Sequence, residues 1–275
     1  MSATLREIIS GFAPITLEQM SGIKLMNRTD TKFVTTEQAL CELLLLARHD
    51  YFAQDIAGER IARYFTAYFD TSEHDMYIMH QNGHVNRQKV RIRSYIDSGL
   101  DFLEVKTKNN RGRTKKKRMA MQDFDPTNPP VDLTFRRQNE VFTAYDDFLR
   151  THLFVATPQQ LKEQLLNQFN RITLVNRART ERLTIDTALA FNNLRTGQQC
   201  DLGGLAIIEL KRDGLQPSPI LDMLLQLRIK PSGFSKYCMG QALTDPNLKR
   251  NRFKPRLRMV DKLLEQAARH THHAN

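Results

Sequence analysis

The sequence has no tryptophan, only three cysteines and no long apolar run. The cysteines, Cys41, Cys200 and Cys238, are odd in number and far apart, which argues against a disulfide framework and against a zinc site. The longest apolar cluster, residues 43–47, is too short to span a bilayer, and the chain shows no signal-peptide pattern. We therefore expect a soluble cytoplasmic protein without a membrane span.

Proline and glycine are also scarce, at 10 and 12 of 275 residues, which is typical of a globular chain rather than a low-complexity one. Positive charge, in contrast, is abundant: the formal net charge is +11 and the pI is about 9.7. This balance suits nucleic acid, a membrane surface or a phosphate-rich small molecule as the partner, and composition alone does not choose among them.

Much of the charge lies in residues 86–118, which hold 12 Lys or Arg against three Asp or Glu and so supply nine of the eleven net positive charges. Like charges that face one another across a sheet repel. A surface of this kind is costly for a protein to build unless it binds a polyanion.

Charged and apolar residues alternate in this stretch with the period of a strand. Lys89, Arg91 and Arg93 share one face, while Val90 and Ile92 share the other. The alternation predicts a strand with one cationic face.

After a turn at residues 97–99 the alternation resumes, with Glu104, Lys106 and Lys108 on one face and Leu103 and Val105 on the other. The two segments therefore predict an antiparallel hairpin whose one face carries cations with a single carboxylate among them.

Strands and helices follow one another along the rest of the chain. Further strands are expected at residues 23–34, 61–70, 115–121, 172–179, 182–186 and 205–211, and helices at 2–12, 37–47, 135–149, 158–169, 217–228 and 255–268. The helix at 158–169 is expected because Leu161, Leu165 and Phe169 follow one another at intervals of four.

The later strands repeat the charged faces of the hairpin. Arg177 and Arg179 share one face, and Glu209 shares another with Lys211. We expect the two sets of strands to close on each other, because closure removes exposed strand edges and encloses a lumen. A lumen of Arg and Lys needs a polyanion such as a triphosphate, and carboxylates among the cations suit a divalent metal that bridges phosphates.

We therefore predict an α+β fold built on a closed antiparallel barrel with helices packed outside. One domain spans residues 1–275, with its core at about 20–240 and a C-terminal helix and tail at 250–275.

Nine short motifs, in order from about residue 20 to 240, then carry a family resemblance. They are residues 28–32 (RTDTK), 68–70 (YFD), 89–93 (KVRIR), 104–106 (EVK), 116–118 (KKR), 176–177 (NR), 182–186 (RLTID), 208–211 (IELK) and 234–237 (FSKY). Together they resemble the polyphosphate polymerase domain of the vacuolar transporter chaperone (VTC) type, a member of the triphosphate tunnel metalloenzymes of the CYTH-like superfamily.

The resemblance implies an eight-stranded tunnel in which basic residues bind ATP, Mn²⁺ or Mg²⁺ is held by a glutamate, and the γ-phosphate passes to a growing polyphosphate chain. The residues that would bind phosphate and act in the reaction are Arg91, Arg93, Lys106, Lys116, Arg177 and Arg182, with Lys32 and Lys236 near the tunnel ends and Glu209 as the metal ligand. We add Lys89, Arg118 and Lys211 as phosphate-binding candidates and Glu104 as a second candidate metal ligand.

Several of these residues have a simpler interpretation. Glu104 serves equally well as an ion-pair partner of nearby Lys or Arg, and Asp186 could pair with Arg182. Lys236 could merely cap a helix. Only part of the run at residues 115–118 can point inward, and Lys116 with Arg118 is the expected inner pair.

Other functions are weighed against polymerase activity. A nucleic-acid-binding module would place aromatic residues among the cations, and only Tyr95 and Phe102 qualify, so no nucleic-acid partner is expected. A non-catalytic polyphosphate or nucleotide sensor and a triphosphatase stay open, although Glu209 argues against the first. The eukaryotic polymerases of this family carry a glutamate where this chain has Asn27 and a lysine where it has Thr29, so the first strand is more similar to that of bacterial members. The hydrolytic tunnel enzymes typically carry several glutamates in the first strand and are a poorer match. Coupled translocation would require a separate membrane partner.

Overall fold

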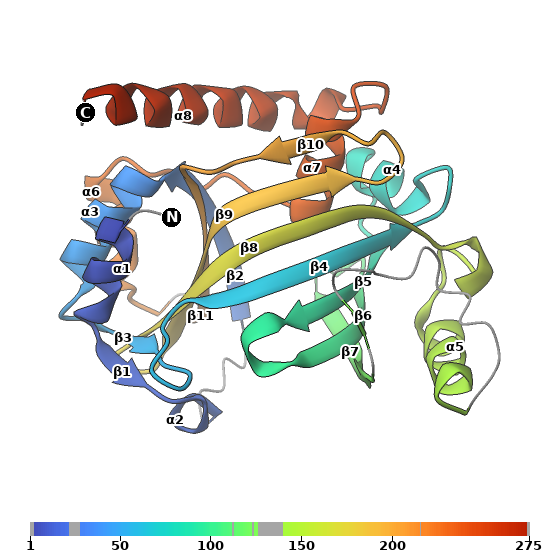
Figure 1. Ribbon diagram of the computed structural model, residues 1–275, viewed down its shortest axis with the longest axis horizontal. Helices are drawn as coiled ribbons and strands as arrows, with labels where there is room; N and C mark the ends of the chain where they lie inside the picture. Colours follow the sequence, from blue (N-terminus) through green and yellow to red (C-terminus); the bar gives the residue numbers. More distant parts are fainter. Residues whose placement is uncertain are drawn as a thin grey trace.

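The computed structural model describes residues 3–21, 28–111, 113–122, 124–125, 140–214 and 216–273. They form an α+β fold in which one large, mostly antiparallel sheet is flanked by helices (Figure 1). The helices are α1 (Ala3–Ser10), α2 (Leu17–Ser21), α3 (Glu37–Ala47), α4 (Asp75–Gln81), α5 (Glu140–His152), α6 (Pro219–Gln226), α7 (Lys236–Thr244) and α8 (Lys254–His273). The strands are β1 (Ala13–Ile15), β2 (Arg28–Thr36), β3 (Tyr51–Gln54), β4 (Ala62–Asp70), β5 (Arg87–Tyr95), β6 (Leu100–Lys108), β7 (Thr114–Met121), β8 (Lys162–Asn176), β9 (Glu181–Asn193), β10 (Gln199–Asp201) and β11 (Leu205–Asp213).

The main path of the sheet runs β2-β11-β9-β8-β4-β5-β6-β7, and each neighbouring pair on this path is antiparallel. Within the described residues, the terminal strands β2 and β7 form no ladder with each other. Over the described residues the sheet is therefore open, and the expected closure into a barrel is not confirmed. Eight strands do form the path, but the two edges are not joined by backbone hydrogen bonds.

The outer face of the sheet is apolar and covered by helices. Near β8, β9 and β11, the helices α1, α3 and α6 pack on one buried cluster that includes Leu43, Ile185 and Ile208. Near β4, β5 and β6, α5 packs on a second cluster that includes Ile92 and Leu103. Since alternate residues of a strand point to opposite faces, these clusters turn the charged residues of the same strands to the inner face.

The inner face is apolar at one end and charged at the other. Leu165, Ile207 and Tyr237 belong to a third buried cluster, in which α7 and α8 cover β8, β9, β11 and β2. Farther along β11, the same face carries Glu209 and Lys211 instead. Two helices therefore fill one part of the inner face, and the charged side chains occupy the rest.

The segment expected to be a helix at residues 158–169 is mostly strand. A single 3₁₀ turn spans Pro158–Gln160, and β8 then begins at Lys162. Leu165 and Phe169, four residues apart, lie in the same buried cluster. Their spacing fits a strand as well as a helix, because four is a multiple of the strand period of two. The helix prediction was therefore wrong.

Most other expected elements lie close to their predicted places, but the strand expected at 172–179 begins ten residues earlier and the one expected at 182–186 runs to Asn193. The first residues of the strand expected at 23–34 lie outside the described residues. The hairpin turn contains a 3₁₀ turn at Ile96–Ser98 that ends on Gly99, whose φ of 59° favours a residue without a Cβ. The expected break at residues 125–130 and the start of the helix at 135–149 lie mostly outside the described residues.

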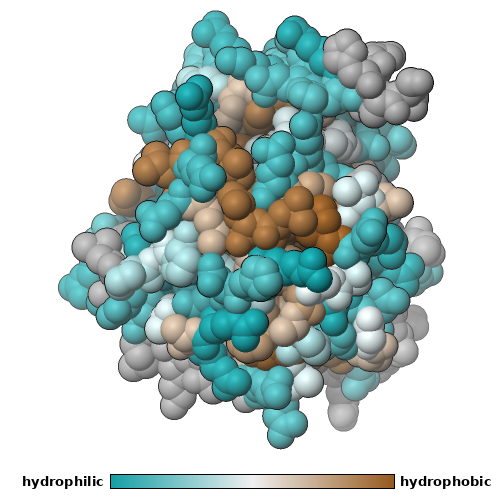
Figure 2. All heavy atoms as spheres, turned by 90° about the vertical axis from the view of Figure 1, so that its left-hand side faces the viewer, coloured by the Kyte–Doolittle hydropathy of each residue, from teal (hydrophilic) through white to brown (hydrophobic). Residues whose placement is uncertain are grey.

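A band of apolar side chains crosses the side of the molecule on which α1, α3 and α6 lie (Figure 2). Leu45 on α3 is 54% exposed and Leu225 on α6 is 76% exposed. None of the described helices has the length and apolar character needed to cross a membrane.

Candidate phosphate-binding face

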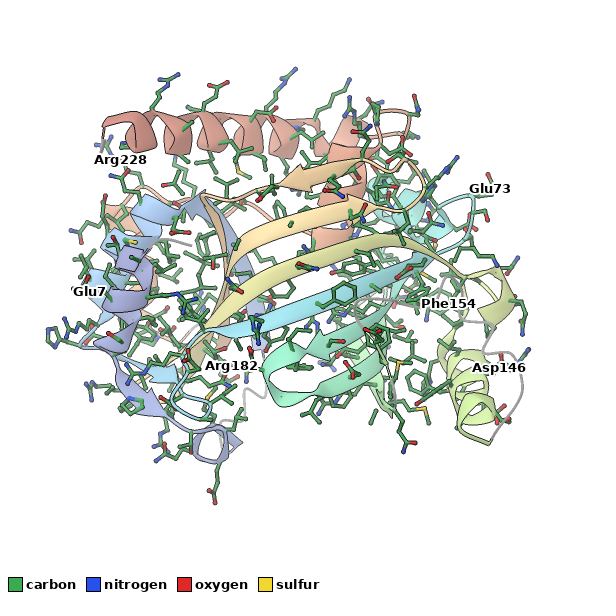
Figure 3. All side chains as sticks on the ribbon, viewed as in Figure 1. Glu7, Glu73, Asp146, Phe154, Arg182 and Arg228 are labelled. Carbon is green, nitrogen blue, oxygen red and sulfur yellow. The ribbon has the colours of Figure 1, made fainter. Side chains whose placement is uncertain are left out.

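The inner face of the sheet gathers cations from seven strands and one helix, with carboxylates among them. We call this surface the cationic face. It comprises Lys32, Lys89, Arg91, Arg93, Lys106, Lys116, Arg171, Arg182, Lys211 and Lys236, together with Glu104, Asp186 and Glu209. Of the residues labelled in Figure 3, Arg182 belongs to this face, whereas Glu7 and Asp146 lie on the outer helices α1 and α5.

Glu104 holds two of these cations from the middle of β6. Its side chain is fully buried, and its carboxylate lies 2.6 Å from Nη2 of Arg91 and 2.9 Å from Nζ of Lys116. Burial alone would raise the pKa of Glu104, but Arg91, Arg93 and Lys116 together lower it to about 2. The structure thus supports the ion-pair interpretation of Glu104, whose oxygens are occupied by these partners.

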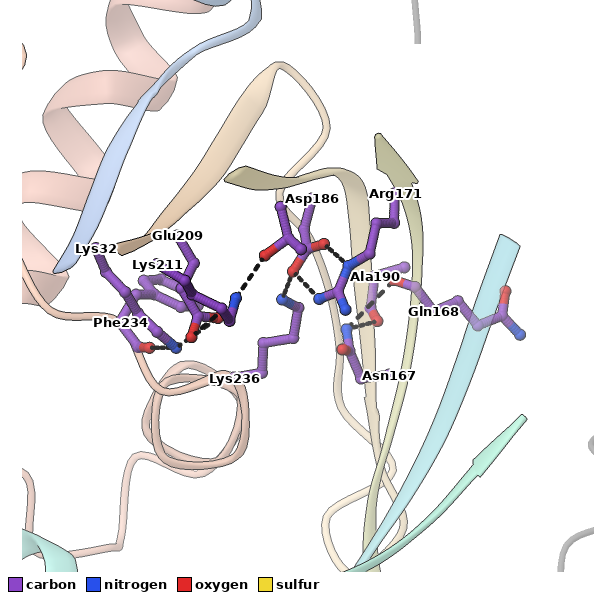
Figure 4. A network of polar contacts seen from close by, with 11 residues as sticks. Lys32, Asn167, Gln168, Arg171, Asp186, Ala190, Glu209, Lys211, Phe234 and Lys236 are labelled. Carbon is purple, nitrogen blue, oxygen red and sulfur yellow. Dashed lines mark hydrogen bonds and ion pairs between the residues drawn. The ribbon is translucent and has the colours of Figure 1, made fainter. Parts of the chain in front are cut away.

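Asp186 does the same on β9. It accepts two hydrogen bonds from Arg171, at 2.6 Å from Nε and 2.8 Å from Nη2, and one from Lys236 (Figure 4). Burial would raise the pKa of Asp186, but Arg171 and Lys236 hold it well below its usual range. The sequence suggested Arg182 as the partner of Asp186, and the structure supplies Arg171 and Lys236 instead.

Glu209 on β11 is the third carboxylate and the most accessible one. It lies 3.2 Å from Nζ of Lys211 and 3.8 Å from Nζ of Lys32, and its side chain keeps 19% of its surface exposed (Figure 4). By comparison, the side chains of Glu104 and Asp186 are 0% and 5% exposed. Of these three carboxylates, Glu209 is therefore the best placed to reach a ligand. Asp30 on β2, which the register places opposite Lys211 on the same face, is exposed.

Arg93 is the cation with the least compensation. It is 7% exposed, and its Nε is buried without a hydrogen-bond partner. Among the described residues no carboxylate lies within ion-pair distance of it, and its guanidinium carbon lies 5.8 Å from the ring centroid of Tyr64. Burial lowers the pKa of Arg93, and the charges of Arg91 and Arg171 lower it further. An anion bound here would give this guanidinium the partner that it lacks.

Burial also disfavours the charged form of two lysines of this face. Burial lowers the pKa of Lys106 to about 7, and the ammonium of Lys32 and the guanidinium of Arg91 add to the effect. Burial also lowers the pKa of Lys236 to about 7, despite its contact with Asp186. A further negative charge nearby would stabilise the protonated form of each lysine. The face therefore suits an anion of high charge.

The segment before α7 contacts two strands that are not neighbours in the sheet, β2 and β5. Nζ of Lys32, on the first strand of the path, donates to the carbonyl of Phe234 at 3.1 Å. Nζ of Lys89, on β5, donates to Oγ of Ser235 at 2.7 Å. Two strands, β6 and β7, separate β5 from the other end of the path. Side chains on β2 and β5, which are not neighbours in the sheet, are therefore linked through this segment.

Two sequence-based candidates lie apart from this arrangement. Arg177 is exposed in the turn after β8, where it donates to the carbonyl of His49 and stacks on Phe52 at 4.9 Å. Arg118 faces inward on the edge strand β7 but is exposed and lies over Phe102 at 4.5 Å. We therefore keep Arg118 as a peripheral candidate and remove Arg177 from the site.

Arg171 replaces Arg177 as the arginine that β8 contributes. The sequence-based reasoning missed it because residues 158–169 were expected to be helical and the strand was expected to start at residue 172. The alternation of Ile172 and Leu174 with Arg171 and Thr173 could have revealed it, since this pattern extends the strand backward by at least one residue.

Lys236 is the first residue of α7 and does more than begin a helix. Ser235 is the N-cap, and its Oγ accepts a hydrogen bond from the backbone of Cys238. The side chain of Lys236 reaches Asp186 and lies 4.3 Å from the ring centroid of Phe169. The start of α7 thus adds an ammonium to the face from outside the sheet.

The described residues contain no cluster of three or more His, Cys, Asp or Glu side chains that could by itself hold a metal ion. This fits a metal held mainly by its substrate, because Mg²⁺ at phosphate sites is often bound by one or two carboxylates together with phosphate oxygens and water. Glu209 is the residue of the cationic face that suits this role, whereas the oxygens of Glu104 are taken by Arg91 and Lys116.

Comparison with known proteins identifies a family. The family model described as the VTC domain matches residues 27–244. A search of curated proteins gave no match.

Solved structures share a distant likeness. The PH1819 protein from Pyrococcus horikoshii OT3 is 12% identical, with a TM-score of 0.40, and the alignment covers 78% of this chain and 98% of that one. The putative adenylyl cyclase HpAC1 from Hippeastrum, whose structure is described as revealing a dominant triphosphatase activity, is 15% identical, with a TM-score of 0.42 and coverage of 80% and 97%.

Proposed function

The chain belongs to the VTC domain family, and from this premise we propose that it is a metal-dependent polyphosphate polymerase. The substrate is ATP, and its γ-phosphate is transferred to a polyphosphate chain bound on the cationic face. ATP as the phosphate donor favours a cytoplasmic location for the reaction.

The observation that supports this proposal most directly is the buried guanidinium of Arg93, which has no carboxylate partner among the described residues. Charged groups are seldom buried without compensation. Neighbouring cations, Arg91 and Arg171, are already held by their own carboxylates. A chain of phosphates supplies several negative charges in a row, and its oxygens match the planar donor pattern of arginine.

The three carboxylates have two different roles: Glu104 and Asp186 orient cations, and Glu209 is the candidate metal ligand. Glu104 and Asp186 orient one arginine and one lysine each, so that Arg91 and Arg171 present fixed donors to the substrate. Preorganised donors of this kind stabilise charge without reorganising during the reaction. Arg93, Lys106 and Lys89 keep free donor capacity for phosphate oxygens.

Phosphoryl transfer depends on alignment and charge neutralisation rather than on covalent chemistry by the protein. An oxygen of the terminal phosphate of the chain forms a bond to the γ-phosphorus of ATP, and the bond between that phosphorus and the β,γ-bridging oxygen breaks. ADP leaves with the electron pair of the broken bond. The cations of the face hold both phosphate chains in line and offset the charge on the leaving ADP.

Glu209 would hold Mn²⁺ or Mg²⁺ together with phosphate oxygens, and the metal would supply further charge neutralisation when bound. Lys32 and Lys211 keep Glu209 ionised, because they lower its pKa well below the usual range although burial opposes this. The carboxylate is thus ready to bind a cation at neutral pH.

The test is incubation of the purified protein with ATP and Mn²⁺, followed by phosphorus NMR and gel analysis of polymer, ADP and free phosphate. Polymer together with ADP is the expected result. Free phosphate without polymer would reassign the protein as a triphosphatase. Tight triphosphate binding without any turnover would instead indicate a non-catalytic sensor.

A further inference from the structure

The positive charge of β5 and β6 continues beyond the residues that face the carboxylates. Past the pair of Arg91 and Glu104, the register places Lys89 opposite Lys106 and then Arg87 opposite Lys108. Like charges directly opposite each other on one face of a sheet are destabilising. Successive residues on one face of a strand lie about 7 Å apart. The hairpin therefore carries cations outward from the cationic face to the end of the sheet.

The start of α8 brings more cations to the same end. Nη1 of Arg252 lies only 1.6 Å from where a Cβ at Gly83 would stand, so its guanidinium packs directly on the turn that follows α4. Nη2 of Arg256 lies 3.4 Å from the corresponding point at Gly233, next to the segment that carries Phe234. Both arginines are thus held beside the end of β5 by close backbone approaches.

His80, on α4, shows that these cations surround one point. Burial lowers the pKa of His80 to about 2, and Lys89, Arg87, Arg256 and Lys108 add to the effect. The Nδ1 atom of this ring is buried without a hydrogen-bond partner. The charges of four cations from β5, β6 and α8 therefore act together on this imidazole.

Carboxylates do not balance this group as they do on the cationic face. Within the described part of the chain, Arg87, Lys108, Arg252 and Arg256 form no ion pair with Asp or Glu. Arg87 donates to the carbonyl of His84 at 2.5 Å, which offsets part of one charge. The remaining positive charge is left for solvent or for a ligand.

We propose that Arg87, Lys108, Arg252 and Arg256 form an outer phosphate-binding segment, which holds the part of a polyphosphate chain that extends beyond the cationic face. The ligand is a linear chain longer than a triphosphate, because the segment continues the line of Arg91, Lys89 and Arg87 on β5. This inference rests on the proposed function. It specifies the end of the sheet toward which the bound polymer extends.

The experiment compares binding of tripolyphosphate with binding of long-chain polyphosphate to the full chain. Arg256→Ala and Lys108→Ala remove two members of the outer segment. Arg258→Ala, on an exposed position of α8, and Lys117→Ala, on the outer face of β7, are the matched controls. Thermal unfolding of each variant checks that the fold is retained.

We expect the unchanged protein to bind the long chain more tightly than tripolyphosphate. Arg256→Ala and Lys108→Ala should each weaken long-chain binding by about threefold and leave tripolyphosphate binding unchanged, as for loss of a partly exposed ion pair. Their long-chain affinity should also depend less steeply on salt, because fewer counterions are released.

Three other results would have distinct meanings. Equal affinity of the unchanged protein for long and short chains would overturn the outer segment and leave the proposed function intact. Equal loss in the control variants would attribute the effect to net charge alone and would also overturn it. Failure of the unchanged protein to bind either phosphate would instead overturn the proposed function.

Discussion

The guanidinium of Arg171 and the carboxylate of Asp186 form a two-point ion pair between neighbouring strands, at 2.6 and 2.8 Å. Lys236 completes the arrangement from the start of α7. Glu104 lies in the same way between Arg91 and Lys116. The cationic face is thus built on two buried carboxylates, each of which fixes one arginine and one lysine.

Asp186→Asn should destabilise the fold. The substitution leaves Arg171 and Lys236 buried without a carboxylate, and removal of one member of a buried ion pair costs about 3 kcal/mol. Urea unfolding should show this loss. Asp261→Asn, at an exposed position of α8, should leave the free energy of unfolding unchanged. A destabilisation of Asp186→Asn no larger than that of the control would show that the pair does not hold the sheet.

Glu104 should make stability fall at acidic pH. Its folded pKa of about 2 lies below the ordinary value of 4.5, so its contribution is complete above pH 4.5 and is lost as the pH falls toward 2. Unfolding measured from pH 6 to pH 2 should therefore decline less steeply for Glu104→Gln than for the unchanged protein. Parallel curves for the two proteins would contradict the lowered pKa.

Arg93→Ala should weaken triphosphate binding by about 30-fold, the loss expected for hydrogen bonds to a charged group. The variant should remain folded, because Arg93 is buried among other cations and has no carboxylate to leave behind. Arg177→Ala is the matched control, since Arg177 lies outside the cationic face. Calorimetric titration with tripolyphosphate measures the affinity of both variants. An equal loss of affinity in Arg93→Ala and Arg177→Ala would show that Arg93 has no special role in binding.

Arg91→Ala should weaken triphosphate binding and also destabilise the fold. The substitution would leave Glu104 fully buried with Lys116 as its one remaining ion-pair partner among the described residues. We therefore expect Arg91→Ala to lower the free energy of unfolding as well as the affinity. A melting temperature equal to that of Arg93→Ala would argue against the role of Glu104.

Triphosphate binding should weaken as the pH rises through 7. Lys106 has a pKa of about 7 in the empty protein, so its charge is lost above this pH, whereas a bound anion favours the protonated form. Titrations in two buffers of different ionisation enthalpy should show proton uptake at pH 7.5. Lys106→Arg should reduce the uptake, and Lys236, with a similar pKa, should account for the remainder.

Glu209→Gln should remove metal-dependent turnover and retain triphosphate binding, because the substitution removes the carboxylate and no cation of the face. Activity with Mn²⁺ and binding without metal are the two measurements. Glu163→Gln, on β8 outside the cationic face, is the control. Full activity in Glu209→Gln would exclude this residue as the metal ligand.

The sequence by itself determined which residues share a face. Strand geometry fixes a period of two, so Lys89, Arg91 and Arg93 had to lie together once the segment was a strand. The same reasoning placed Glu104 and Lys106 beside them and turned the apolar residues between them to the core. These assignments need no knowledge of distant segments.

Tertiary structure alone decided which charges are paired and whether the sheet closes. Asp186 meets Arg171 through the register of two strands and Lys236 through the docking of a helix 50 residues farther along the chain. Over the described residues β2 and β7 form no ladder with each other, and whether such edges meet depends on sheet curvature, which is set by packing over the whole chain. Such contacts arise between segments far apart in sequence, and local alternation carries no information about them.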